Sequence, residues 1–148
     1  MQELFINPNY LIMTSTKGVG IWMDHSSAHV MEFTAEPITT TVIESAFTAQ
    51  TREKSMEKSE HLMHNKEQQQ QSAYYKKISS VIKMYNRVLL FGPTNAKLEL
   101  FNLLQADEQF KKVAIELLQA DKMTPAQEHA FVRDHFSKKF TIAIASKK

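Results

Sequence analysis

The stretch RVLLFGPTNAKLELFNLL, residues 87–104, places an apolar run, a Gly-Pro turn and an amphipathic segment directly after one another. The run VLLF, residues 88–91, has the length and composition of a buried β-strand. After Pro93 the apolar residues recur at helical spacing, which predicts a helix whose apolar face is formed by Ala96, Leu100, Leu103 and Leu104. A strand that leads at once into such a helix is typical of an α/β fold.

Three strands are predicted before this corner. The stretch GVGIWMDHSSAHVMEF, residues 18–33, predicts a β-hairpin, because apolar residues alternate along it and DHSS supplies polar turn residues. We expect its one tryptophan, Trp22, to lie in the core. The stretch ITTTVIES, residues 38–45, is rich in β-branched residues and predicts a third strand.

The later elements alternate between helix and strand. A helical stripe precedes the corner and is formed by Tyr74, Ile78, Val81, Ile82 and Tyr85. Beyond the corner, KKVAIELL predicts a fifth strand, TPAQ a capped helix start, and FTIAIA a final short strand. The order βββ-α-β-α-β-α predicts an α/β fold with a mixed sheet, as in ribonuclease-H-like proteins.

We expect one domain, because 148 residues suffice for one core. It would span residues 18–148, after an irregular leader at residues 1–17. Residues 46–71 are polar and charged and predict a mobile loop that runs into a helix, and residues 137–148 predict a basic tail.

Composition excludes several classes of site. There is no cysteine, and three glycines are too few for a dinucleotide-binding loop, a Walker A loop or a nucleophile elbow. The N-terminal residues have neither the basic start of a signal peptide nor an apolar run of membrane-spanning length. The sequence therefore predicts a soluble cytoplasmic protein with no membrane association, cofactor or metal.

Charge is distributed unevenly. No Asp or Glu occurs in residues 68–98, which hold Lys76, Lys77, Lys83, Arg87 and Lys97. On a helical wheel Lys76, Lys83 and Arg87 fall nearly on one line, opposite the apolar stripe, and Gln69 extends that line. These six residues are candidates for contact with the phosphates of RNA. The alternative is an ordinary solvated helix face.

The Gly-Pro corner is a second candidate. A helix N-terminus can bind an anion through its free backbone N–H groups, here with Gly92, Thr94 and Asn95. Against this, there is only one glycine, and Pro93 removes a donor. The sequence therefore favours a structural corner.

A metal site is the weakest candidate. Asp24 ends the first strand, where a carboxylate binds metal in ribonuclease-H-like nucleases, but Glu32, Glu44, Asp107 and Asp121 show no reliable ligand spacing. The six histidines likewise form no convincing ligand set. We expect Asp24 to cap a turn.

Three stretches carry a family resemblance. WMDHSSAHV, residues 22–30, fits the pattern W-x-D-H-x-x-A; FGPTNAKLEL, residues 91–100, fits G-P-x-x-A-K-x-x-L. ADKMTPAQEHAFVRDHF, residues 120–136, is similar to the segment that leads into that family's last helix. Together they resemble stand-alone bacterial relatives of the middle domain of archaeo-eukaryotic class I release factors and Pelota-like proteins. The resemblance implies a ribonuclease-H-like fold and a role near translation.

One departure from the family limits this expectation. Release factors hydrolyse peptidyl-tRNA with a Gly-Gly-Gln motif, and the corresponding loop of this chain, residues 46–71, has no glycine. Pelota-like members also lack the motif and act in ribosome rescue, so hydrolase activity is not carried over.

Three hypotheses follow. The first is a non-catalytic translation-associated module that contacts the ribosome or tRNA through the basic helix face. The second is a metal-dependent nuclease that uses Asp24. The third is a protein-interaction or self-assembling module, in which the polar loop at residues 46–71 serves as the docking segment and the chain could form a homo-oligomer.

Overall fold

The computed structural model describes residues 17–33, 38–46 and 60–146, and it describes side chains at residues 17–33, 38–46 and 65–137. The elements are β1 (Gly18–Met23), β2 (Ser27–Glu32), β3 (Thr40–Glu44), α3 (Glu60–Ile82), β4 (Arg87–Gly92), α4 (Ala96–Gln105), the 3₁₀ turn η2 (Glu108–Phe110), β5 (Ala114–Gln119) and α5 (Pro125–Ser146). The predicted α/β fold and the order βββ-α-β-α-β-α are therefore confirmed. Of the predicted leader, residues 1–16 lie outside the described residues.

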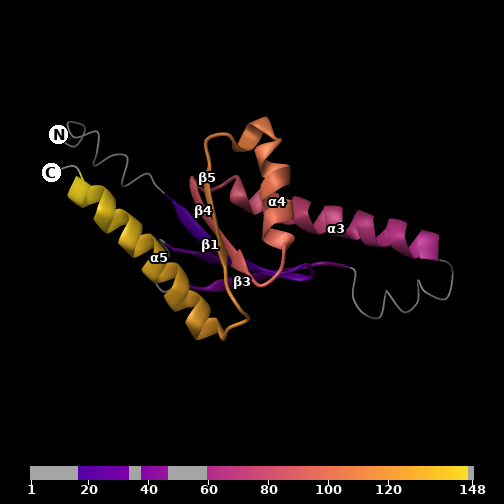
Figure 1. Cartoon of the computed structure of the whole chain (residues 1–148), viewed down its shortest axis with the longest axis horizontal. Helices are drawn as coiled ribbons and strands as arrows, with labels where there is room; N and C mark the ends of the chain where they lie inside the picture. Colours follow the sequence, from indigo (N-terminus) through magenta and orange to yellow (C-terminus); the bar gives the residue numbers. More distant parts are fainter. Residues whose placement is uncertain (1–16, 34–37, 47–59, 147–148) are drawn as a thin grey trace.

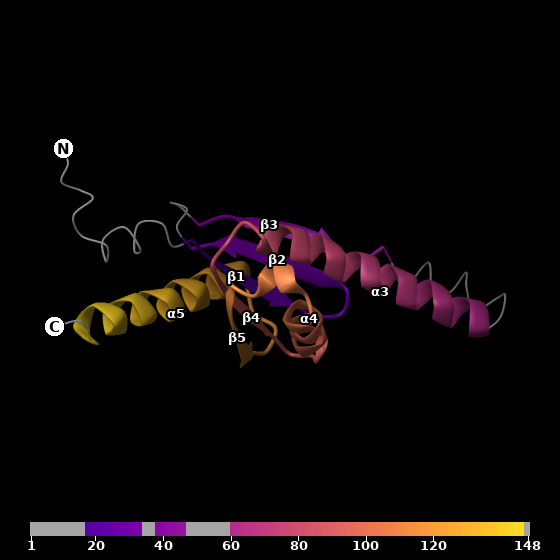
Figure 2. The same cartoon turned by 90° about the horizontal axis from the view of Figure 1, so that it is seen from above.

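The five strands form one mixed sheet in the order β3-β2-β1-β4-β5. Strand β2 pairs antiparallel with both β1 and β3, whereas β4 runs parallel to β1, and β5 runs parallel to β4, after helical crossovers. Helix α3 extends past one end of the sheet, and α5 extends past the other (Figures 1 and 2). Strand β1 is the central strand of the sheet and is completely buried, and its parallel neighbour β4 is buried at all positions but the first.

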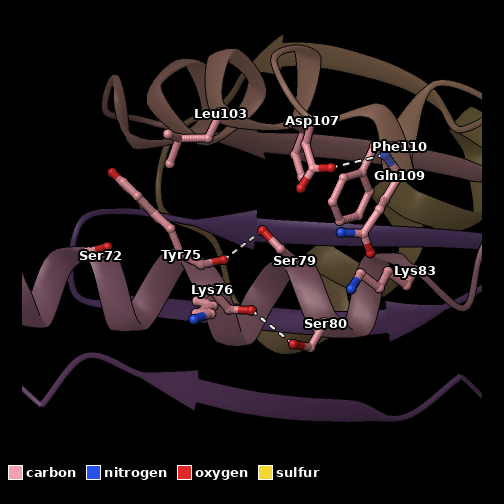
Figure 3. A pocket seen from close by; sticks show the side chains of 11 residues that line it. Ser72, Tyr75, Lys76, Ser79, Ser80, Lys83, Leu103, Asp107, Gln109 and Phe110 are labelled. Carbon is pink, nitrogen blue, oxygen red and sulfur yellow. Dashed lines mark hydrogen bonds between the residues drawn. The ribbon is translucent and has the colours of Figure 1, made fainter.

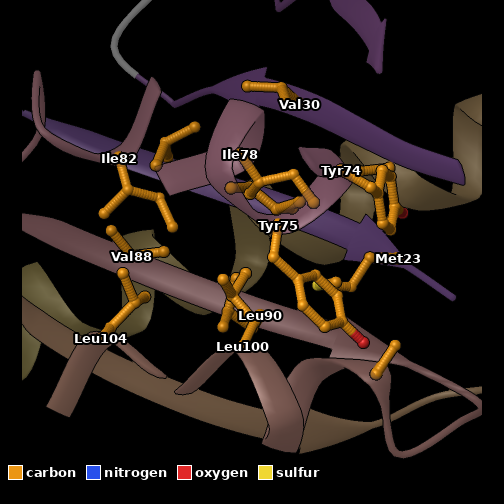
Figure 4. Packing of buried hydrophobic residues seen from close by; sticks show 14 of the residues in the cluster. Met23, Val30, Tyr74, Tyr75, Ile78, Ile82, Val88, Leu90, Leu100 and Leu104 are labelled. Atoms are coloured by element: carbon orange, nitrogen blue, oxygen red, sulfur yellow. The ribbon is translucent and has the colours of Figure 1, made fainter. Parts of the chain in front are cut away.

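Helices cover both faces of the sheet, and each face has its own core. Alternate residues of β1 point to opposite sides: Ile21 packs with α3 and α4, whereas Trp22 packs with α5. Figure 4 shows the first core, in which Tyr74, Ile78 and Ile82 of α3 meet the sheet. The buried position of Trp22 is thus confirmed. The predicted stripe packs in this core as expected, but Val81 and Tyr85 are only partly buried, and Tyr85 lies beyond the end of α3.

Helix α5 comes close to the sheet because β1 has a glycine beneath it. A Cβ atom on Gly20 would collide with the side chain of Val132. The helix begins with the predicted capping box: Gln127 N donates to Thr124 Oγ1 at 3.2 Å, and Thr124 N donates to Gln127 Oε1 at 2.9 Å. Further along α5, Glu128 is 1% exposed and its carboxylate lies 2.9 Å from His29 Nδ1 of β2.

Two predicted boundaries are wrong. Helix α3 starts at Glu60, so residues 60–71 of the predicted loop are helical, while residues 47–59 lie outside the description. Helix α5 continues to Ser146, where a short strand and a basic tail were predicted. Both stretches lack glycine and proline, so a helix that has nucleated next to them can propagate through them.

One residue of α4 departs from the predicted apolar face. Ala96, Leu100 and Leu104 are buried, but Leu103 is 53% exposed.

Among the described residues, no helix is both long enough and apolar enough to cross a membrane.

Candidate nucleic-acid groove beside helix α3

A groove of about 410 Å³ runs between the C-terminal half of α3 and the segment formed by α4 and η2 (Figure 3). The α3 wall is formed by Ser72, Tyr75, Lys76, Ser79, Ser80 and Lys83. The opposite wall is formed by Leu103, Leu104, Asp107, Gln109 and Phe110. Two of the six predicted RNA-binding residues, Lys76 and Lys83, therefore line one groove.

Helical spacing explains why these two lysines share a side of α3. They are seven residues apart, which corresponds to about two turns and roughly 10 Å along the axis. Lys83 follows the last helical residue, but its backbone N–H still donates to Ser79 O at 3.2 Å, so it keeps the helical direction. Both lysines are exposed, and Lys83 Nζ lies 5.9 Å from the ring centroid of Phe110. The groove thus presents two accessible ammonium groups.

A tyrosine holds the two walls of the groove together. Tyr75 is 5% exposed, and its Oη donates to Glu99 Oε1 of α4 at 2.6 Å. Burial, reinforced by this bond, raises the pKa of Tyr75. The same hydrogen bond lowers the pKa of Glu99, and a contact of 3.2 Å with His25 Nε2 acts in the same direction. Tyr75, which lines the groove, is therefore held by a hydrogen bond to the ionised carboxylate of Glu99.

The polar groups between the lysines are mainly hydrogen-bond acceptors. Ser79 Oγ donates to Tyr75 O at 2.8 Å, and Ser80 Oγ donates to Lys76 O at 3.0 Å. Their hydroxyl protons are thus used inside the helix, which leaves oxygen lone pairs for a ligand. On the other wall, Asp107 accepts the N–H of Gln109 through Oδ1 at 2.9 Å and faces α3 (Figure 3).

No protein-family model matches this chain, and no curated protein matches its sequence. Solved structures do match. Pelota from Archaeoglobus fulgidus has a TM-score of 0.55 at 9% identity, over 95% of this chain and 42% of that one. Pelota from Thermoplasma acidophilum has a TM-score of 0.50 at 14% identity, over 99% of this chain and 47% of that one.

The fold resembles that of archaeal Pelota proteins. The archaeal translation termination factor aRF1 also matches, with a TM-score of 0.48 at 13% identity over 95% of this chain and 45% of that one. This chain spans less than half the length of each of these proteins. The resemblance expected from three sequence motifs is therefore confirmed at the level of the fold, and a bacterial stand-alone branch stays a prediction.

The other predicted RNA-binding residues lie outside the groove. Gln69 and Lys77 are exposed on α3 but do not line it. Arg87 is the first residue of β4 and is only partly exposed, so the predicted line of three cations on one helix is wrong. The cause is that α3 ends at Ile82, whereas the helical wheel was extended to Arg87.

Lys97 belongs to the Gly-Pro corner rather than to a basic surface. It is 7% exposed, and its Nζ donates to Gly92 O at 3.0 Å, Thr94 O at 2.7 Å and Gln119 Oε1 at 3.0 Å. Burial lowers its pKa. Because an ammonium group has three donors, Lys97 has none left for a phosphate. Its assignment to an exposed RNA contact is therefore corrected to a structural role.

Gly92 and Thr94 of the Gly-Pro corner also make contacts within the protein. Gly92 has a φ of +155°, and a Cβ atom there would collide with the carbonyl oxygen of Met23. Thr94 Oγ1 accepts the N–H of Ala96 at 3.2 Å, whereas the side chain of Asn95 makes no cap bond to α4. These contacts support the structural corner that the sequence favours, and anion binding by Gly92, Thr94 and Asn95 stays a prediction.

Asp24 caps the turn between β1 and β2, as expected. Its Oδ1 accepts the backbone N–H groups of Ser26 and Ser27, both at 2.8 Å, and the hydroxyl of Ser26 at 3.1 Å. Within the part of the chain that the structure describes, no group of three or more His, Cys, Asp or Glu residues could hold a metal ion.

Of the eleven residues that line the groove, the sequence predicted only Lys76 and Lys83 as binding residues. Ser79 and Ser80 follow Lys76 by three and four residues, so helical spacing alone could have placed them beside it. Asp107, Gln109 and Phe110 gave no local signal, because their position opposite α3 depends on how α4 packs against the sheet.

Proposed function

We propose that this chain is a translation-associated module that binds the ribosome or tRNA through the exposed basic side of α3. The fold it shares with Pelota supports a role in translation, in agreement with the resemblance of its sequence. The chain has no Gly-Gly-Gln motif, so the proposed role is non-catalytic with respect to peptidyl-tRNA hydrolysis.

One observation carries the proposal. Helix α3 buries its apolar side against the sheet and exposes Lys76 and Lys77, and Lys83 is exposed directly after it. All three lie within a stretch of 31 residues, 68–98, that lacks any acidic side chain. No carboxylate in that stretch competes with a phosphate for these lysines. Each phosphate that a lysine neutralises releases condensed counterions, which makes such binding favourable at low salt.

The test is binding of the purified protein to ribosomes, tRNA and duplex DNA across a salt series. The variant Lys76→Glu/Lys83→Glu reverses both groove lysines. We expect it to bind ribosomes or tRNA at least about tenfold more weakly and with a shallower salt dependence, since about two phosphate contacts are lost. Circular dichroism and urea denaturation establish that the variant is folded.

The matched control is Lys122→Glu/Arg133→Glu. It changes the net charge by the same amount at two exposed positions, one just before α5 and one within it, away from α3. We expect this control to retain most of its binding. If both variants lose binding equally, the effect is one of net charge. If the wild type binds none of the three, or binds independently of salt, the proposal is overturned.

A further inference from the structure

We propose that the groove beside α3 selects single-stranded RNA over single-stranded DNA by accepting the 2′-hydroxyl of a ribose. This inference rests on the proposed function, because it names the chemical class of nucleic acid that the basic side of α3 holds. It arises from the arrangement of donors and acceptors in the groove.

The size of the groove favours a single strand. A volume of about 410 Å³ lies in the range of sites that hold one small molecule, so the groove can admit one nucleotide. A base that is unstacked from a single strand can enter such a site, and proteins usually recognise RNA through unpaired nucleotides of this kind. The occupant is therefore a flexible single-stranded segment.

The two lysines determine where its phosphates lie. Lys76 and Lys83 are both on the α3 wall and roughly 10 Å apart along the axis, so they can contact two phosphates of one strand. Asp107 is on the facing wall and repels phosphate. The backbone of the strand must therefore follow α3, and its sugar edge must face the space between Asp107 and the two serines.

That space holds hydrogen-bond acceptors on both walls, beside the side-chain amide of Gln109, which can also donate. The hydroxyl protons of Ser79 and Ser80 are donated to backbone carbonyls, and one oxygen of Asp107 accepts from Gln109, which leaves its second oxygen available. A ribose 2′-hydroxyl can donate a hydrogen bond to any of these oxygens. Deoxyribose cannot, so bound DNA would displace water from the acceptors without replacing its hydrogen bonds.

The experiment compares oligonucleotides of one base sequence in three forms: RNA, DNA that carries deoxyuridine in place of thymidine, and 2′-O-methyl RNA. Dissociation constants are measured by fluorescence anisotropy at several salt concentrations. For the wild-type protein we expect RNA to bind about tenfold more tightly than the other two, because the hydroxyl donor is absent from both.

The variant Ser79→Ala/Ser80→Ala/Asp107→Asn removes both hydroxyl oxygens and replaces the second carboxylate oxygen of Asp107 by an amide NH₂ group, while the amide oxygen still accepts from Gln109. Both lysines are kept. We expect its ratio of RNA to DNA affinity to fall close to one, while binding stays salt-dependent. Lys76→Glu/Lys83→Glu is the comparison variant, and it weakens RNA and DNA binding by the same factor. The 2′-O-methyl comparison needs no substitution, so the proposal remains testable even if the triple variant does not fold.

The two proposals fail in different ways. Equal affinity of the wild-type protein for all three oligonucleotides, with binding that still requires the lysines, overturns the selection of RNA and leaves the proposed function in place. A preference for RNA that survives in the folded triple variant also overturns the role of these acceptors. Lack of lysine-dependent binding to any RNA overturns both proposals.

Discussion

Lys97 and Lys76 have the same side chain but different surroundings in the fold. Lys76 is exposed on α3, whereas Lys97 is buried and donates three hydrogen bonds to the loop before α4 and to β5. Both lie in the acid-free stretch, and both were predicted to contact RNA. Local composition therefore predicted which residues are cationic. Burial and hydrogen-bond partners then distinguish a lysine that a ligand can reach, such as Lys76, from one that stabilises the fold, such as Lys97.

The substitution Lys97→Met tests this separation. It keeps the length of the side chain and leaves the oxygens of Thr94 and Gln119 without the ammonium donor. We expect the free energy of unfolding to fall by about 1–3 kcal/mol, as measured by urea denaturation, because partly buried acceptors lose their partner. RNA affinity of the folded variant should stay within a factor of about two of the wild type, since no phosphate contact is removed.

The exposed Lys122→Met is the matched control, and we expect it to leave the free energy of unfolding almost unchanged. A Lys97→Met variant that is as stable as the wild type but has lost RNA binding would assign Lys97 to the ligand and contradict its structural role in the Gly-Pro corner.

At the scale of elements, α3 and α4 are joined by Tyr75, Glu99 and His25. Tyr75 is on α3, Glu99 is in the first turn of α4, and His25 lies in the turn between β1 and β2. The hydrogen bond from Tyr75 stabilises the ionised form of Glu99 and lowers its pKa below the ordinary value of 4.5. This hydrogen bond links the helix of one wall, α3, to α4 of the other.

A pH dependence of stability follows from the direction of that shift. A carboxyl group whose pKa is lower in the folded state binds fewer protons there than in the unfolded chain. Its contribution to stability is therefore present above pH 4.5 and is lost as the pH falls through the lower, folded-state pKa. We expect the difference in unfolding free energy between the wild type and Glu99→Gln to be largest near neutral pH and to shrink at acidic pH.

Urea denaturation at a series of values from about pH 3 to pH 7 measures this difference. Glu108→Gln serves as the control, because Glu108 is a largely exposed carboxylate on the neighbouring η2 that pairs with Lys111. A difference for Glu99→Gln that stays constant over the whole range would contradict the role of the ionised carboxylate.

At the scale of the whole molecule, the sheet separates two layers. The groove lies in the layer of α3 and α4, and α5 packs on the other face with a separate core. The close approach of α5 depends on Gly20, whose missing side chain makes room for Val132. Changes at this contact should therefore alter stability without altering the chemistry of the groove.

The pair Gly20→Ala and Val132→Ala tests this arrangement. Gly20→Ala alone should lower the free energy of unfolding by about 1–3 kcal/mol, because the added methyl group overpacks the contact. Val132→Ala alone should also destabilise, by creating a cavity. The double variant should lose less than the sum of the two changes, because the smaller side chain makes room for the methyl group.

Denaturation of all four proteins gives the coupling energy, and RNA binding by the folded variants is the control measurement. Additive effects would mean that the two residues do not share a contact. Loss of RNA binding in a fully folded Gly20→Ala variant would contradict the independence of the two layers.

The sequence by itself determined the order of most elements, because periodicity, caps and turns depend on residues close together in the chain. The alternation in β1, the apolar stripe of α3 and the capping box at Thr124 were all predicted and are all present. The length of α5 was not predicted, since an alternating apolar stretch such as residues 140–145 fits a short strand as well as a continued helix.

Only the tertiary structure decided which side chains meet. Tyr75 and Glu99 are 24 residues apart in the chain, and Lys97 and Gln119 are 22 apart, so no local pattern pairs them. The position of Asp107 opposite α3 likewise depends on the packing of α4 on the sheet. Local spacing therefore predicted the lysines of one helix, while burial and long-range contacts selected Lys76 and Lys83 for the groove, Arg87 for the sheet and Lys97 for the corner.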